Sequence, residues 1–147
     1  MSVLSAKDLF SEQERQQIIE AIKQAERRTS GEIRLHLEDT CSEDVLDHTA
    51  FLFEKLNMHK TKHRNGVLFY VSVKDHQFAI LGDRGINEKV PTDFWDSVKT
   101  AVLHEFVLGN YLKGLIDGID MAGDKLRRFF PIERDDKNEL SDEISYG

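Results

Sequence analysis

The stretch from Asn65 to Ile86 constrains the fold more than any other part of the chain. It contains two apolar runs, Val67–Val73 and Gln77–Leu81, separated by a short polar turn. Apolar residues occupy neighbouring as well as alternate positions, which is typical of strands buried on both faces of a sheet. A turn this short joins antiparallel strands. The segment therefore predicts a β-hairpin within a sheet that other elements cover on both sides.

The segments around the hairpin have the periodicity of helices and of one further strand. Ser11 and Glu14 form a capping-box pattern, S-x-x-E, ahead of an apolar helical stripe. The run 32–38 alternates between apolar and polar side chains, as a strand does when one face is better covered than the other. Ser42 is placed to cap a second helix. Pro91 opens a third helical region, and a fourth follows it.

The resulting order is helix, strand, helix, strand, strand, helix, helix. A strand–helix–strand unit has a right-handed crossover and parallel strands. Strands buried on both faces need helices on both sides, so the sequence predicts an α/β fold, a three-layer α/β/α sandwich around a small mixed sheet. Pro131 ends the last helix. We expect a single domain over residues 10–131 and a flexible acidic tail over 132–147.

The overall composition argues against several functional classes. The 147 residues include 27 acidic side chains against 20 Lys and Arg, a formal charge of −7 at pH 7. This balance argues against general nucleic-acid binding, which requires cations that neutralise phosphates, and it suits a protein that binds a cation. No stretch approaches the roughly 20 apolar residues of a membrane span. Cys41 is the single cysteine, and the N-terminus lacks a signal-peptide core, so we expect a cytoplasmic protein.

The predicted topology brings three polar residues to one edge of the sheet. Glu32 begins the first strand, Asn65 precedes the second, and Asp83 ends the antiparallel third. Two carboxylates and an amide are oxygen ligands that suit Ca²⁺, with Mg²⁺ or another divalent cation as the alternative. The competing interpretation is that Asn65 and Asp83 are turn residues and that Glu32 is only a strand end.

The opposite edge of the sheet competes as a binding site. Ligands of open parallel sheets usually bind beyond the carboxyl ends of the strands, where this chain has residues 38–40 and Asp75. An antiparallel third strand places carboxyl ends at both edges, so we rank the edge with Asp83 first. If Asp75 and His76 form a two-residue loop, Asp83 lies opposite Leu68.

Two further sets of residues are weaker candidates. Arg84 lies in the sequence Gly-Asp-Arg-Gly, which can form an anion-binding turn beside a guanidinium group. Asp117 and Asp120 fall on one face of the last helix and would add metal ligands if that face met the sheet edge. The simpler interpretation of each is a solvated polar surface.

The order and spacing of several short motifs resemble the TPM domain family. The resembling segments are Ser30–Ile33, Asn65–Leu68, Gly82–Ile86, and a late pattern of Phe and Gly that runs from Phe106 to Ile119. The similarity covers roughly residues 10–131 and is closest to short bacterial forms. It implies an α/β/α fold with a mixed sheet. Some members of the family are described as acid phosphatases, some bind Ca²⁺, and others act as assembly factors.

Three functional hypotheses follow from the residues and the resemblance. The first is a divalent-cation-binding accessory domain, with Ca²⁺ as the expected ion and Asp83, Glu32 and Asn65 as ligands. The second is a weak metal-assisted acid phosphatase, in which Arg84 would stabilise developing charge on phosphate. The third is a module that binds a protein partner and no small ligand. The first is preferred because no nucleophile or general base stands out.

Overall fold

The computed structural model describes residues 5–133 and 139–147 and consists of one sheet between two helical layers. The sheet has the strand order β3-β2-β1-β4, in which β1 is parallel to β2 and to β4, and β2 is antiparallel to β3. This confirms the predicted α/β class and the mixed sheet. The elements, in chain order, are α1 (Glu12–Glu26), β1 (Glu32–Glu38), α2 (Val45–Lys55), β2 (Gly66–Ser72), β3 (Gln77–Gly82), α3 (Arg84–Asn87), α4 (Asp96–Val107), α5 (Tyr111–Arg127) and β4 (Ser145–Tyr146).

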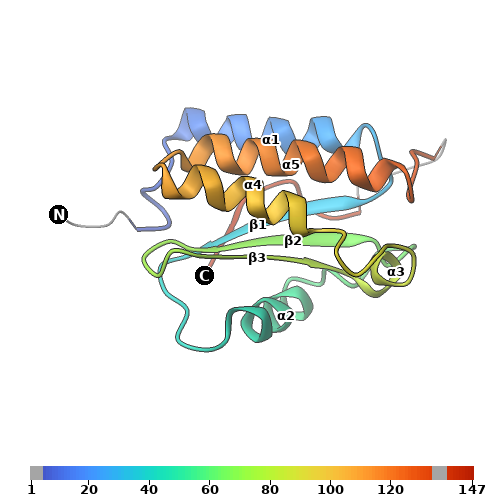
Figure 1. The fold of residues 1–147 in the computed structure, drawn as a ribbon, viewed down its shortest axis with the longest axis horizontal. Coiled ribbons are helices and arrows are strands. Elements are labelled where there is room, and N and C mark those ends of the chain that lie inside the picture. Colours follow the sequence, from blue (N-terminus) through green and yellow to red (C-terminus); the bar gives the residue numbers. More distant parts are fainter. Residues whose placement is uncertain (1–4, 134–138) are drawn as a thin grey trace.

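The two faces of the sheet are covered unequally. Helices α1, α4 and α5 lie together on one face, and α2 lies on the other (Figure 1). All seven residues of β2 are buried. Phe69 packs in the larger apolar cluster beneath the three helices, and the neighbouring Tyr70 packs in the smaller cluster beneath α2. A central strand with an apolar residue at nearly every position is therefore explained by burial on both sides.

The start of α1 was predicted correctly from the sequence, and the start of α2 less accurately. Ser11 accepts a hydrogen bond from the Glu14 N–H at 3.1 Å, and the Glu14 side chain accepts one from the Ser11 N–H at 2.9 Å. The predicted capping box is therefore confirmed. Helix α2 begins two residues later than predicted, because Asp44 and not Ser42 is its N-cap. The Asp44 carboxylate accepts from the Asp47 N–H at 3.0 Å.

The hairpin is present, but its predicted register was wrong by two residues. The pairs Ser72–Gln77 and Val67–Gly82 define a four-residue turn, with His76 in the left-handed backbone region at a φ of 55°. Asp83 consequently lies opposite Gly66 and not Leu68, and its N–H donates to the Gly66 carbonyl at 2.9 Å. The longer turn moves Asp83 closer to the beginning of β2.

The end of the chain contributes an element for which the sequence carried no clear signal. Of the expected flexible tail, residues 134–138 lie outside the part of the chain that the structure describes. Residues 139–147 run back along β1, and β4 pairs with it in parallel through His36–Ser145 and Leu37–Tyr146. Leu140 packs against the smaller apolar cluster, whereas Tyr146 packs against the larger one. The structure therefore places the last nine residues on the edge of the sheet. Of the helices described, none is long and apolar enough to cross a membrane.

Candidate functional site

The three residues predicted to form a site do lie at one edge of the sheet. Glu32 begins β1 and donates its N–H to the Asn65 carbonyl at 3.2 Å. Asp83 follows β3 and is held to the start of β2 by its backbone hydrogen bond. The three residues are only 3%, 1% and 6% exposed, respectively. The order of the strands therefore places the three residues at the same edge of the sheet, as predicted.

Their side chains nevertheless have different partners. Both carboxylate oxygens of Asp83 accept from Arg64, Oδ2 from Nε at 2.8 Å and Oδ1 from Nη2 at 3.0 Å. Strand β2 lies between β1 and β3, and a spacing of about 4.8 Å per strand puts the Glu32 and Asp83 backbones roughly 10 Å apart. Ca²⁺ holds its ligands at about 2.3–2.6 Å, so this spacing does not favour one ion bound to both carboxylates. The amide nitrogen of Asn65 donates to the Ser30 carbonyl at 3.2 Å.

Glu32 instead faces the returning C-terminal segment. Its Oε1 atom accepts from the backbone N–H groups of Glu139 and Leu140, both at 2.6 Å. These two contacts fasten the segment to the beginning of β1. They also bring a further acid, Asp142, to the same part of the molecule.

Glu26, the last residue of α1, completes a group of three carboxyls that we call the acidic cluster: Glu26, Glu32 and Asp142. Glu26 Oε2 accepts from the Ile33 N–H at 2.9 Å, and its carboxyl lies within hydrogen-bonding range of Asp142. The Oδ1 atom of Asp142 is buried and accepts no hydrogen bond from the residues that the structure describes. Burial, the contact with Asp142 and the charges of Asp142 and Glu32 together raise the pKa of Glu26 to about 10. At neutral pH Glu26 therefore retains a proton, because burial disfavours its charged form and the neighbouring carboxylates add to this effect.

The remaining predicted site residues are held by partners elsewhere. Asp117 pairs with Lys113 at 2.6 Å, and Asp120 pairs with Arg28 at 2.9 Å, both on the helical layer. Arg84 is exposed at the start of the four-residue helix α3, where its N–H donates to Asp83 Oδ1 at 2.7 Å. The structure places none of these three side chains in the acidic cluster.

The opposite edge of the sheet carries a second polar network. Glu38 Oε1 accepts from the Tyr70 hydroxyl at 2.7 Å and lies 2.6 Å from His48 Nε2. Burial opposes the charged form of His48, but hydrogen bonds to Glu43 and Glu38 outweigh it and raise the pKa of His48. Burial similarly opposes ionisation of Glu38, yet hydrogen bonds from Tyr70 and the histidines hold its pKa below the ordinary value. His36 stays neutral more readily, because burial lowers its pKa.

The acids at this second edge also accept hydrogen bonds from within the protein. Asp39 Oδ1 accepts from the Ala6 N–H at 2.6 Å, and Asp75 Oδ2 accepts from the Cys41 N–H at 2.5 Å. Within residues 5–133 and 139–147, no three or more His, Cys, Asp or Glu side chains are already arranged to hold a metal ion.

Sequence reasoning identified Glu32 but missed its two partners in the acidic cluster. Glu26 lies in the last turn of an amphipathic helix, where an acid has no local signature of function. Asp142 lies in a segment without helical or strand periodicity. The one available signal was that Glu26 lies close in sequence to Glu32, because the connection from α1 to β1 is short.

Comparison with known proteins assigns the fold and the family. A family model described as TPM domain matches residues 3–125. Protein BA42 of the psychrophilic bacterium Bizionia argentinensis is 46% identical, with 96% of this chain and 97% of that chain covered and a TM-score of 0.91. The N-terminal domain of a P. gingivalis protein has the same fold at 16% identity, covering 88% of this chain and 96% of that chain, with a TM-score of 0.69. The N-terminal domain of cg2496 from Corynebacterium glutamicum is 10% identical, with coverages of 92% and 79% and a TM-score of 0.64. A search of curated proteins finds no match.

Proposed function

The chain belongs to the TPM domain family, and from this premise we propose that it is a divalent-cation-binding accessory domain whose expected ion is Ca²⁺. The observation that carries the proposal is the acidic cluster, in which buried Glu32 lies near Glu26 and Asp142. Three carboxyls in one partly buried place are unfavourable unless a proton or a cation compensates their charge. The raised pKa of Glu26 marks the position at which a cation can replace a proton.

The ligand set of this proposal differs from the one that the sequence favours. Glu32 is kept, and Glu26 and Asp142 join it, because carboxylate oxygens are the ligands that Ca²⁺ prefers. Asp83 is left out because both of its oxygens accept hydrogen bonds from Arg64. Ca²⁺ is expected over Mg²⁺, since it tolerates irregular geometry, whereas Mg²⁺ requires a nearly ideal octahedron.

Cation binding at this position would couple to the C-terminal segment. Asp142 belongs to that segment, and Glu32 accepts two of the segment's backbone N–H groups. A cation shared by Glu26 and Asp142 would fasten the segment to the end of α1. We therefore expect bound Ca²⁺ to stabilise the pairing of β4 with β1, which consists of two residue pairs.

The phosphatase alternative has less support from the geometry. It requires Arg84 near a metal held by Asp83, but the guanidinium group that contacts Asp83 belongs to Arg64. The acidic cluster would also repel a phosphate unless more than one cation were bound. A phosphatase assay with Ca²⁺ or Mg²⁺ present tests this alternative directly, and metal-dependent turnover lost in Asp83→Ala would favour it.

The proposal is tested by titrating ¹⁵N-labelled protein with Ca²⁺ and following amide shifts. Saturable shifts are expected at Glu26, Glu32 and residues 139–143. Glu26→Gln and Asp142→Asn should each weaken the affinity at least tenfold, because each removes a charged ligand. Asp117→Asn is the matched control: it removes one acid from the helical layer and should leave the affinity within twofold.

The pH dependence provides an independent check. Because binding releases the Glu26 proton, the affinity for Ca²⁺ should rise about tenfold for each pH unit between pH 6 and pH 8. Calorimetry in buffers of different ionisation enthalpy measures the proton release directly. Binding with no proton release, or equal weakening by Asp117→Asn, would refute the acidic cluster as the site.

A further inference from the structure

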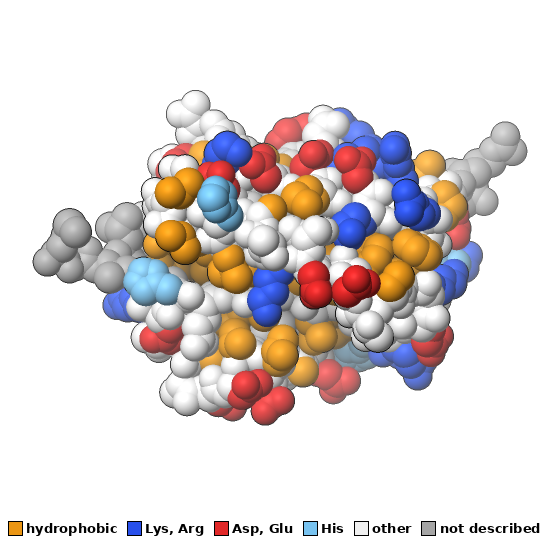
Figure 2. All heavy atoms as spheres, viewed as in Figure 1, with side chains coloured by type: hydrophobic (Ala, Val, Ile, Leu, Met, Phe, Trp, Pro, Cys, Tyr) orange, Lys and Arg blue, Asp and Glu red, His pale blue; other side chains and the backbone are white. Residues whose placement is uncertain are grey.

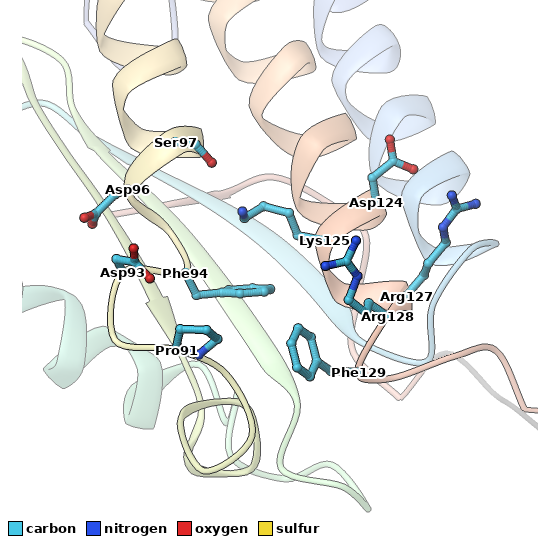
Figure 3. A pocket seen from close by; sticks show the side chains of 10 residues that line it. All are labelled: Pro91, Asp93, Phe94, Asp96, Ser97, Asp124, Lys125, Arg127, Arg128 and Phe129. Atoms are coloured by element: carbon cyan, nitrogen blue, oxygen red, sulfur yellow. The ribbon is translucent and has the colours of Figure 1, made fainter.

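An open cavity lies between the start of α4 and the end of α5, on the helical layer (Figure 3). Its volume is about 680 Å³. Two aromatic rings form its floor, and Phe94 and Phe129 meet edge to face with centroids 5.5 Å apart. Lys125 and Arg128 extend over these rings from α5, and the Ser97 hydroxyl lies on the α4 side (Figure 3). The cavity therefore combines two nearly perpendicular aromatic rings with two cations.

The two cations over the rings form no ion pair with an acid among the residues that the structure describes. Within the described part of the chain, neither Lys125 nor Arg128 forms an ion pair. Lys125 Nζ instead lies over the Phe94 ring, 5.0 Å from its centroid.

Two of the three acids that line the same cavity point away from the rings. Asp124 projects away from the floor and pairs with Arg28 at 2.6 Å. The Asp96 carboxylate points away from the rings, whereas Asp93 lies beside Phe94 at the α4 end of the cavity (Figure 3). On the surface, a hydrophobic patch near the end of α5 has Lys and Arg side chains on one side and Asp or Glu side chains on another (Figure 2). The space above the rings is consequently the part of the cavity that favours an anion.

We propose that this cavity binds a phosphomonoester carried on a planar ring, of which a nucleoside monophosphate is the simplest example. Lys125 and Arg128 are three residues apart on one helical face, so their Cβ atoms lie about 5–6 Å apart and both side chains can reach one phosphate. A phosphate dianion matches two cations, and Arg contacts it through two parallel N–H groups. The planar ring stacks on Phe129, and the Ser97 hydroxyl donates to a phosphate oxygen.

The test is a titration of ¹⁵N-labelled protein in EDTA with AMP, with inorganic phosphate and with adenosine. AMP should give saturable shifts at Ser97 and at residues 125–129. Inorganic phosphate and adenosine should each bind at least tenfold more weakly, because each makes only half of the contacts. No saturable shifts with AMP would overturn the proposal. Equal affinity for phosphate and AMP would overturn the role of the aromatic floor.

Three charge-matched variants separate a built site from general attraction. Lys125→Gln and Arg128→Gln should each weaken AMP binding about tenfold, the loss expected for one charge-assisted hydrogen bond. Arg127→Gln is the control, because it removes the same charge from the same turn but its side chain points away from the rings (Figure 3). It should change the affinity less than twofold. Equal weakening by all three variants would overturn the proposal, and unchanged amide spectra of the free variants confirm their folding.

This site is independent of the acidic cluster. The acidic cluster joins α1, β1 and the C-terminal segment, whereas the cavity is formed by the α3–α4 connection, α4 and the end of α5. Glu26→Gln should therefore weaken Ca²⁺ binding at least tenfold and leave AMP binding unchanged. Loss of AMP binding in Glu26→Gln would contradict the assignment of the phosphomonoester to the cavity.

Discussion

Replacement of Glu26 by Gln should stabilise the protein at neutral pH in the absence of metal. The folded protein holds the Glu26 proton up to a pKa of about 10, whereas the unfolded chain releases it near the ordinary glutamate pKa of 4.5. Between these two values the folded state binds one more proton than the unfolded state. The free energy of unfolding consequently falls by about 1.4 kcal/mol for each pH unit as the pH rises.

The magnitude at pH 7 follows from this slope. pH 7 lies roughly two and a half pH units above the ordinary glutamate pKa, so the free energy of unfolding is about 3 kcal/mol lower there than at pH 4.5. Gln has the shape of the protonated carboxyl, so its Oε1 can still accept from the Ile33 N–H and its amide can donate to Asp142. Glu26→Gln should therefore be up to about 3 kcal/mol more stable than wild type at pH 7 and nearly equal to it at pH 4.5. For a domain of this length that gain raises the Tm by about 10 °C.

Urea unfolding in EDTA at pH 5, 6, 7 and 8 measures this difference directly. The stability of wild type relative to Glu26→Gln should decline steadily across the series. Glu20→Gln is the control, because Glu20 is exposed on the same helix and its replacement should leave the pH dependence unchanged. A Glu26→Gln protein that is less stable than wild type at pH 7, or a difference independent of pH, would refute the account of the acidic cluster.

Three further predictions concern the edges of the sheet. Asp83→Asn should lower the free energy of unfolding by about 1–3 kcal/mol, because it leaves the Arg64 guanidinium without its charged partner; denaturant unfolding measures this loss. The same variant should not change the affinity for Ca²⁺ in the NMR titration. Gly85→Ala should lower the free energy of unfolding in urea by more than about 2 kcal/mol, because an added Cβ would collide with the backbone carbonyls of residues 63 and 64. Retention of wild-type stability would contradict this close contact between the two backbone segments. His48→Gln should be destabilising at pH 6 and progressively less so as the pH rises above 6.5, because the raised pKa of His48 means that its stabilising charge is present at low pH and lost at high pH. Unfolding curves of wild type and variant at pH 6 and pH 9 should show this difference in stability shrinking.

The agreement between sequence and structure is best where the signal is local. The Ser11–Glu14 capping box requires residues three positions apart, and the two-sided burial of β2 appears in seven consecutive residues. The register of the hairpin was less accessible, because a four-residue turn and a two-residue turn fit the same polar segment. His76 in the left-handed region decided between them, and His does not indicate this conformation as Gly does.

The candidate site was only partly accessible from the sequence. The order of the strands placed Glu32, Asn65 and Asp83 at one edge correctly, since the ends of consecutive elements follow from chain direction. Their chemical partners did not follow, because Arg64 reaches Asp83 from a loop and Asp142 reaches Glu26 from the far end of the chain. The C-terminal strand was also missed, since two paired residues are too few to produce a strand pattern.

The sequence by itself determined the helical stripes, their order along the chain and a sheet buried on both faces. These properties depend on the periodic burial of apolar side chains, which neighbouring residues encode. Only the tertiary structure decided which carboxyl meets a guanidinium, which meets two other carboxyls, and which cations lie above the aromatic rings. The physical reason is that charge, desolvation and proton affinity depend on distances of a few ångströms between groups far apart in sequence, and packing of the whole domain sets those distances.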